Sequence, residues 1–220
     1  MFYRTAIGIW RAAPLDAFDW LEHGFGSRHA NPSSENLATL NQIHSDVVVR
    51  ECGETGRLGQ GDALISDRPG ARIGVRTADC LPILIVDEER RAIAVVHAGW
   101  RGTVHGVAGR TVESMRRTFG SRPGSLHAAV GPGINVCCFE VGPEVSIQFR
   151  QLLPERNDLD RKTHIDLVDV NRRTLIAAGI QPGRIYTGAP CTVCTPGEFH
   201  SWRRDGDRAG RMISAAGILA

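Results

Sequence analysis

Three residues of this sequence belong to the types that bind soft metal ions at neutral pH, and each stands beside an apolar stretch: His44, Cys80 and His97. Two imidazoles and one thiolate with an open fourth position would form a catalytic zinc site. Such a zinc lowers the pKa of a bound water to about 7 and supplies hydroxide at neutral pH. A second chemistry needs no metal: Cys80 as nucleophile, His97 as base, and His44 or Asp79 as the group that orients the base. A third interpretation is purely structural, with Cys80 as a small buried apolar group and the histidines as hydrogen-bonded core residues.

Cys80 and His97 stand at the outer ends of an expected β-hairpin. A symmetric turn would pair Val86 with Arg91, and the same register would place Cys80 directly opposite His97. Directly opposed residues have Cβ atoms about 4.5–5.5 Å apart, which suits a shared metal or a nucleophile–base pair. The hairpin itself is indicated by two apolar runs, 81–86 and 92–96, that flank the polar segment 87–91.

Two segments could bind an anion. The first, A-G-W-R-G-T (98–103), leads from the hairpin into an expected helix, with Arg101 as a cation, Gly102 as a site of close approach and Thr103 as N-cap. A helix N-terminus with small residues favours phosphate, although a tight strand-to-helix turn explains the same letters. The second, F-H-S-W-R-R-D-G-D-R-A-G-R-M (199–212), interleaves aromatic residues with arginines, including Arg203 and Arg204. It could bind single-stranded nucleic acid, stack on one base and hold one phosphate, or form a solvated loop.

Composition points to a single globular domain spanning residues 1–220. Hydrophobic residues make up 42% of the chain and charged residues 23%, and the net charge of +2 is too small to indicate a nucleic-acid partner. No run reaches the ~18–20 apolar residues of a membrane-spanning helix. The apolar run at the N-terminus is too short for a signal peptide, so we expect a cytoplasmic protein.

Six cysteines in such a compartment are expected to be thiols or ligands rather than disulfides. Cys80 belongs to the site above. The pairs Cys137-Cys138 and Cys191-x-x-Cys194 are expected to be structural, because one CxxC without a second pair is a weak zinc signal.

The order of elements predicts a mixed-sheet α/β (α+β) layered domain rather than a doubly wound parallel sheet. Short apolar runs outnumber helical patterns, and the central hairpin is antiparallel. Helices are expected from Thr103 to Phe119 with Gly120 as stop, from Pro143, and over 166–178, while 23–34 and 53–61 are expected to be loops.

Taken together, the motifs resemble the laccase-domain, or multicopper polyphenol oxidase, family, whose members are also described as purine nucleoside phosphorylases and as a peptidoglycan editing factor. The matching segments run in order from residue 20 or so to the C-terminus. They are N-Q-I-H (41–44), G-D-A-L-I-S (61–66), T-A-D-C-L-P-I-L (77–84), H-A-G-W-R-G-T (97–103), G-P-G-I (131–134), C-C-F-E-V-G-P-E-V (137–145), C-T-V-C (191–194), F-H-S-W-R-R-D-G (199–206) and G-R-M (210–212).

The resemblance implies an α/β/β/α sandwich related to certain cysteine hydrolases, with His44, Cys80 and His97 as the metal-binding catalytic residues. It implies phosphorolysis of adenosine, inosine, guanosine and methylthioadenosine, together with deamination of adenosine. Zinc is then the expected cofactor, with copper second, and the partners are a purine nucleoside and phosphate bound by a monomer or homodimer. In this mechanism Asp79 is the nearest candidate for a proton shuttle, and Asn41 and Gln42 of N-Q-I-H would contact substrate.

Two further activities stay open within the resemblance. One is a metal-independent cysteine hydrolase acting on peptidoglycan precursors, and the other is copper-dependent polyphenol oxidation. Multicopper oxidation needs many histidine ligands, and this chain has eight histidines in all. Only residues 30–40 separate H-G-F-G-S-R-H from N-Q-I-H, where family members carry a longer stretch, so we expect substrate range and rate to differ.

Overall fold

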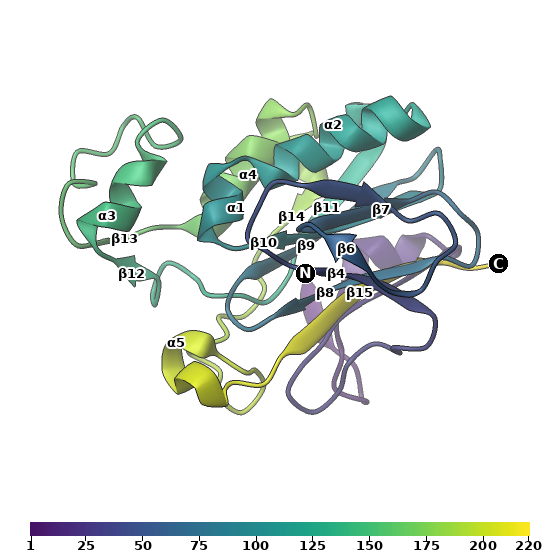
Figure 1. The fold of residues 1–220 in the computed structure, drawn as a ribbon, viewed down its shortest axis with the longest axis horizontal. Coiled ribbons are helices and arrows are strands. Elements are labelled where there is room, and N and C mark those ends of the chain that lie inside the picture. Colours follow the sequence, from purple (N-terminus) through teal and green to yellow (C-terminus); the bar gives the residue numbers. More distant parts are fainter.

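Two β-sheets pack face to face, and helices cover the outer face of one of them (Figure 1). The computed structural model describes all 220 residues. One sheet has seven strands in the order β1-β2-β3-β15-β8-β4-β6, and the other has six in the order β14-β11-β9-β10-β7-β5. Each sheet contains parallel pairs among antiparallel ones, such as β4–β8 in the first and β5–β7 in the second, so both sheets are mixed. The expected layered α/β fold is confirmed.

The strands are short, and a two-stranded ribbon, β12-β13, lies apart from both large sheets. Their bounds are β1 Phe2–Arg4, β2 Trp10–Ala12, β3 Leu21–Phe25, β4 Leu37–Asn41, β5 Val48–Arg50, β6 Gly56–Gln60, β7 Ala63–Ser66, β8 Arg72–Thr77, β9 Leu81–Asp87, β10 Ala92–Ala98, β11 Leu126–Val130, β12 Glu140–Val141, β13 Thr163–His164, β14 Ile185–Tyr186 and β15 Met212–Ile218. Strands β3 and β6 correct the prediction of loops over 23–34 and 53–61. Their glycines pair within sheets, where close backbone approach outweighs the low strand propensity of glycine.

The central hairpin forms as predicted, but its register differs. Ala92 pairs with Asp87, which puts His97 opposite Pro82 rather than Cys80. The closing pair encloses four residues in both cases, but the turn lies one residue further along the chain, over 88–91 rather than 87–90. Because the shift moves the partner by two residues, Cys80 stays on the same side of the hairpin as His97.

Strands β9 and β10 are buried on both faces because they lie between the helices and the other sheet. Their side chains alternate between two cores. Ile83, Ile85 and Val96 point to the helix-side core, whereas Leu84 and Val95 point to the core between the sheets. The continuous apolar runs of the sequence therefore fill two cores at once. This packing on both faces holds the ends of the hairpin, where Cys80 and His97 lie.

The helices are α1 Trp100–Val104, α2 Val107–Phe119, α3 Pro143–Ser146, α4 Leu167–Ala177 and α5 Trp202–Asp205. The predicted helix over 103–119 is divided, because Gly106 adopts a left-handed conformation with φ of 76°. Gly99, not Thr103, is the N-cap of α1, while Gly120 ends α2 and Asp166 caps α4 as expected. No helix is long and apolar enough to cross a membrane.

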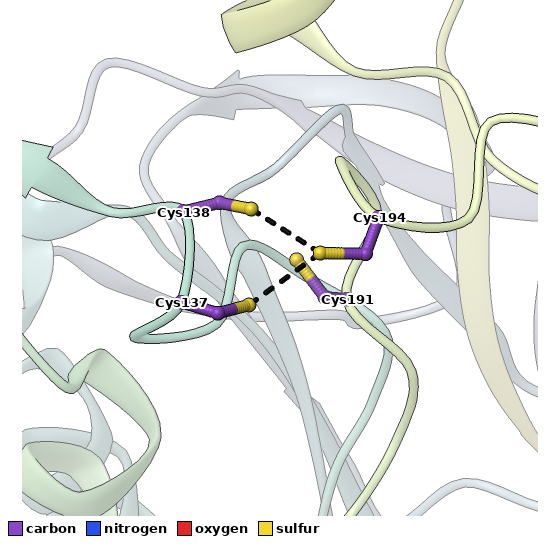
Figure 2. Close-up of side chains that lie close together, drawn as sticks. All are labelled: Cys137, Cys138, Cys191 and Cys194. Atoms are coloured by element: carbon purple, nitrogen blue, oxygen red, sulfur yellow. Dashed lines mark hydrogen bonds between the residues drawn. The ribbon is translucent and has the colours of Figure 1, made fainter.

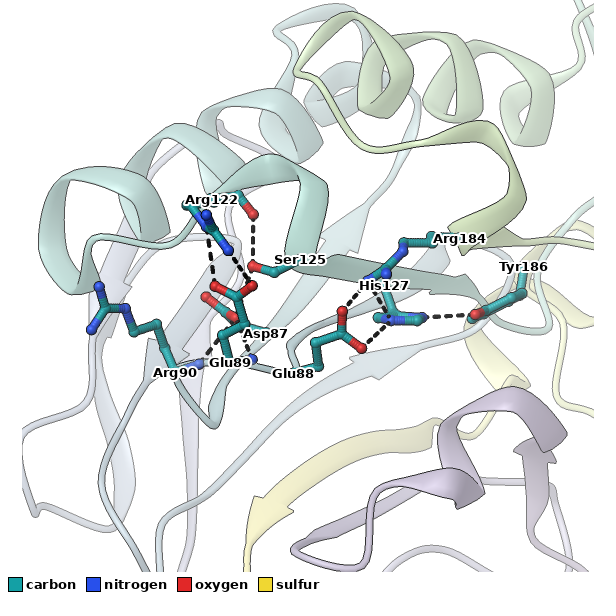
Figure 3. A network of polar contacts seen from close by, with 9 residues as sticks. All are labelled: Asp87, Glu88, Glu89, Arg90, Arg122, Ser125, His127, Arg184 and Tyr186. Atoms are coloured by element: carbon teal, nitrogen blue, oxygen red, sulfur yellow. Dashed lines mark hydrogen bonds and ion pairs between the residues drawn. The ribbon is translucent and has the colours of Figure 1, made fainter.

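The turn of the central hairpin lies at the opposite end of β9 from Cys80, and a polar network holds it (Figure 3). Asp87 is fully buried, and its Oδ1 accepts hydrogen bonds from the backbone N–H groups of Glu89 and Arg90 and from the Ser125 hydroxyl, at 2.9–3.1 Å. Its Oδ2 is buried without a partner. Asp87 thus fixes the turn and joins it to the start of β11.

Replacing Asp87 by Ala is expected to lower the free energy of unfolding by about 2–4 kcal/mol, because the buried Ser125 hydroxyl and two partly buried backbone N–H groups lose their acceptor. Asp87→Asn is expected to cost much less, since it keeps Oδ1 and removes a buried charge. Urea denaturation of the three proteins tests this, and equal losses in the two variants would contradict the role given to Oδ1.

Candidate metal centre

The structure brings His44, Cys80 and His97 together at the ends of the central hairpin. The ligand atoms of the three side chains all lie within 4.8 Å of one another, and Cys80 Sγ lies 4.0 Å from His44 Nε2. The two imidazole rings meet edge to face with centroids 4.9 Å apart. Gly99 makes this approach possible, because a Cβ there would lie 2.9 Å from Cys80 Sγ and 3.0 Å from His44 Cδ2.

Asp62 is the carboxylate that orients this cluster. Its Oδ1 lies 2.8 Å from His97 Nδ1, so Nδ1 carries the proton and Nε2 is directed to the cluster. The same carboxylate accepts hydrogen bonds from the backbone N–H groups of Ile43, His44 and Ser45 and from the Ser45 hydroxyl. These bonds hold the loop in which His44 has a positive φ of 58°. One buried side chain therefore sets the positions of both histidines.

The pKa values of Cys80 and His97 are both strongly shifted. Burial raises the pKa of the Cys80 thiol, but hydrogen bonding to His44 and His97 outweighs burial and lowers it to about 6. Burial lowers the pKa of His97, but its hydrogen bonds to Asp62 and Cys80 outweigh burial and raise it to about 9. At neutral pH and without a metal, Cys80 is a thiolate beside a protonated His97.

The residues fit a metal ion of the zinc class. The ligand atoms of one tetrahedral zinc lie roughly 3.3–3.8 Å apart, so small side-chain rotations would close the observed set around one ion. Two imidazoles and a thiolate leave a fourth position open, and the Asp62–His97 contact is the outer-shell interaction typical of metal-bound histidine. The donor set alone does not choose between zinc and copper.

Asp79, the candidate proton shuttle, has its carboxylate directed elsewhere. It is buried, and it accepts hydrogen bonds from the hydroxyls of Thr192 and Ser201 and from the backbone N–H of Arg203, at 2.6–3.0 Å. Its φ of 90° lies in the left-handed region. Asp79 also lines the cleft, and its contacts tie the loop that carries Thr192 and Ser201 to the residue before Cys80.

The cluster opens into a cleft of about 1170 Å³. Its wall includes aromatic residues, each with an arginine guanidinium over its ring: Arg101 over Trp100, Arg203 over Phe139 and Arg211 over Trp202, at 4.3–5.5 Å from the ring centroids. Arg57 and Arg76 also line the cleft. None of these five arginines makes an ion pair. Three carboxylates, Asp79, Glu140 and Glu144, also line the cleft, so with five arginines its net charge is positive.

The predicted substrate residues divide into two groups. Asn41, Gln42, Arg101 and Arg203 line the cleft, although the Gln42 side chain is used in hydrogen bonds with the backbone of Arg76. Gly102, Thr103 and Arg204 do not line the cleft.

The contacts of the second group account for their absence from the cleft. The Thr103 hydroxyl is buried and accepts a hydrogen bond from Asn171, and Gly102 packs against the Ser45 carbonyl. The Arg204 guanidinium is used up by Asp205 and by the backbone carbonyls of neighbouring residues. The helix α1, at whose N-terminus the sequence predicts an anion site, has five residues.

Sequence reasoning missed Asp62 and the cleft arginines 57 and 76 as functional residues, whereas Arg211 lies in the predicted segment 199–212. Asp62 stands in the G-D-A-L-I-S segment, where an acidic residue directly before a buried strand was the available signal. The arginines carried no such signal, because they come from separate parts of the chain.

The chain is similar to known proteins in both sequence and structure. A family model described as multi-copper polyphenol oxidoreductase laccase matches residues 26–219. A purine nucleoside phosphorylase of Deinococcus radiodurans is 40% identical over 84% of this chain and 72% of its own length. The adenosine deaminase RL5 of an unknown prokaryotic organism is 43% identical over 70% of this chain, and the aligned part is 60% of that protein. The crystal structure of YlmD from Geobacillus stearothermophilus superposes with a TM-score of 0.90 and 26% identity over 100% of this chain and 99% of that one.

Gly99→Ala is expected to weaken zinc binding by about tenfold or more without changing a ligand, because the new Cβ would force Cys80 and His44 apart. Zinc affinity measured by competition with a chromophoric chelator tests this. Gly124→Ala is the matched control, since a Cβ at Gly124 meets nothing within 4 Å. Unchanged affinity in Gly99→Ala would contradict the proposed ligand set.

Zinc affinity is expected to rise about tenfold per pH unit from pH 7 to pH 9 and then to level off. The sign follows from the pKa values: Cys80, with a pKa of about 6, is already a thiolate, whereas His97, with a pKa of about 9, must lose one proton to bind. Calorimetry in buffers of different ionisation enthalpy should count about one proton released per zinc in this range. A pH-independent affinity would show that His97 is not a ligand.

Proposed function

Because the chain belongs to the multi-copper polyphenol oxidoreductase laccase family, several of whose relatives carry the name purine nucleoside phosphorylase, we propose that it is a metal-dependent purine nucleoside phosphorylase with adenosine deaminase activity. The observation that carries the proposal is the His44–Cys80–His97 cluster at the base of a cationic, aromatic-lined cleft. Zinc is the proposed metal, and adenosine, inosine, guanosine and methylthioadenosine are the proposed substrates.

The cleft supplies the two surfaces that such a substrate needs. Trp100 and Trp202 offer flat faces for a purine ring, and Trp202 is 49% exposed. Arg101 has no acidic partner, and Arg203 uses only Nη1, which donates to the carbonyls of Cys138 and Glu140. The remaining guanidinium donors are available to phosphate, which arginine binds through charge-assisted hydrogen bonds.

In phosphorolysis, a phosphate oxygen attacks ribose C1′ while the bond to the purine nitrogen breaks, and the departing base takes up the proton that the phosphate gives up. The arginines hold the phosphate and offset its charge, which lets it approach the sugar in a fixed orientation. A metal held by His44, Cys80 and His97 would supply Lewis-acid chemistry and activate water for deamination. Asp62 keeps the proton on His97 Nδ1, so that Nε2 is the nitrogen that would bind that metal after losing its proton.

A second candidate function rests on the thiolate itself. A Cys80 pKa of about 6 beside a protonated His97 is the arrangement of a cysteine nucleophile, with Asp62 as the orienting third residue. This pair would support a metal-independent hydrolase acting on peptidoglycan precursors. Activity that survives a chelator and is abolished by iodoacetamide would favour it over the metal enzyme.

Copper-dependent polyphenol oxidation is the least supported activity. Of the eight histidines, only His44 and His97 lie in a metal-binding cluster, and the other cluster contains cysteines alone. Several copper ions would lack ligands.

The proposed setting follows from the chemistry of the chain. All six cysteines are free thiols, which supports a reducing compartment, the cytoplasm. The cleft is large enough for a nucleoside and phosphate, and we propose these small molecules, rather than a nucleic acid or a membrane, as partners of a monomer or homodimer.

Chromatography of products after incubation with adenosine, with and without phosphate, tests the proposed function. Adenine is expected only with phosphate, and inosine in both samples. Cys80→Ala is expected to lose both activities, whereas Cys52→Ser, an exposed cysteine outside the clusters, should keep them. Unchanged adenosine in both samples from a zinc-containing protein would refute the proposal.

Arg101→Met is expected to reduce phosphorolysis about 10–100-fold while leaving deamination nearly unchanged, because only phosphorolysis needs the anion site. Steady-state rates of adenine and inosine formation separate the two effects. Arg161→Met, an exposed arginine that does not line the cleft, is the control. Parallel loss of both activities would mean that Arg101 does not act through phosphate.

A further inference from the structure

A second cluster of metal-binding side chains lies outside the proposed active site, and it consists of cysteines only (Figure 2). Cys137 and Cys138 come from the loop between β11 and β12, and Cys191 and Cys194 come from the loop between β14 and α5. We call Cys137, Cys138, Cys191 and Cys194 the four-cysteine cluster. The fold therefore unites a vicinal pair with a CxxC pair more than 50 residues away in the sequence.

The sulfur atoms surround a space the size of one ion. All four Sγ atoms lie within 4.8 Å of one another. Cys194 Sγ lies 3.5 Å from that of Cys137 and 3.3 Å from that of Cys138, as the dashed lines in Figure 2 show. A tetrahedral zinc with bonds of about 2.3 Å places its sulfur ligands roughly 3.8 Å apart. The observed spacing is too long for disulfide bonds and close to that of a tetrathiolate site.

The surroundings suit thiolates. Cys191 is buried, and its Sγ accepts a hydrogen bond from the backbone N–H of Asn135 at 3.5 Å. The guanidinium of Arg203 donates to the carbonyl of Cys138, which brings a positive charge to a cluster that would carry excess negative charge around a divalent ion.

We propose that the four-cysteine cluster binds one zinc ion as a structural tetrathiolate site, distinct from the metal centre at His44, Cys80 and His97. Four sulfur ligands around one position are typical of zinc or mononuclear iron, and they leave no open position for a substrate. This proposal does not depend on the proposed function, because it rests on different residues.

The site would fasten two walls of the cleft to each other. Phe139 and Glu140 follow the vicinal pair directly, and both line the cleft. The other loop carries Thr192 and Ser201, which hold Asp79, and continues into Trp202 and Arg203, which also line the cleft. Without the ion, the two loops are joined by hydrogen bonds such as those from Thr192 N–H to the Gly133 carbonyl and from the Asn135 side chain to the Ala189 carbonyl.

Metal content measured by mass spectrometry on the purified full-length chain, grown with zinc, tests the proposal. Wild type is expected to hold two zinc ions per chain, Cys80→Ala one, and Cys194→Ser one. Cys52→Ser, the control, should keep both. One zinc in wild type that Cys80→Ala removes and Cys194→Ser leaves in place would overturn the proposal, and so would iron in the four-cysteine cluster. One zinc in wild type that only Cys194→Ser removes would support this site while refuting the zinc centre of the proposed function.

A measurement on the unmodified protein covers the case in which Cys194→Ser does not fold. Iodoacetamide labelling followed by peptide mass spectrometry reports each cysteine, and Cys52 should react with or without chelator. Labelling of Cys137 and Cys194, both exposed, should rise at least tenfold after a zinc chelator is added. Labelling that the chelator does not change, or a disulfide within the cluster in non-reduced protein, would overturn the proposal.

Discussion

The arrangement of the candidate centre depends on one buried carboxylate, that of Asp62. It accepts hydrogen bonds from His97 on one side and from three consecutive backbone N–H groups, at residues 43–45, on the other. A buried charge is tolerated only when such donors surround it, and here the same donors fix the two imidazole ligands. Loss of this carboxylate would destabilise the positive-φ loop at His44 and would no longer fix the tautomer of His97. The same hydrogen bonds therefore stabilise the loop and orient both imidazoles.

Asp79 plays the corresponding part on the other side of Cys80. Its hydrogen bonds reach Thr192, Ser201 and Arg203, far away in the sequence, and the backbone carbonyl of the same residue accepts from Ile134. Cys80 therefore follows directly after a residue held by two separate loops. These are the loops that the four-cysteine cluster would join. The same contacts would therefore stabilise both the cleft wall and the position of Cys80.

Much of this architecture could be predicted from the sequence. The continuous apolar runs of β9 and β10 predicted a buried hairpin, and Gly120 and Asp166 marked helix ends, because local chemistry decides these features. The register could not be predicted, since it depends on how Asp87 closes the turn. The family motifs brought His44, Cys80 and His97 forward as candidates. The long-range partners of Asp79, Thr103 and Arg204 could not be foreseen, because tertiary contacts alone decide whether a polar side chain faces a cleft or the protein interior.

The charge distribution shows why composition says little about function in this chain. A net charge of +2 indicates no particular partner, and most arginines outside the cleft are paired with acidic residues. The arginines of the cleft have no such partners, so the excess positive charge is concentrated beside the candidate metal centre. In a partly enclosed cleft these charges are less screened than on the open surface, and they attract anions there. A cleft that joins unpaired guanidinium groups to a candidate metal centre is therefore suited to anions, even though the protein as a whole is nearly neutral.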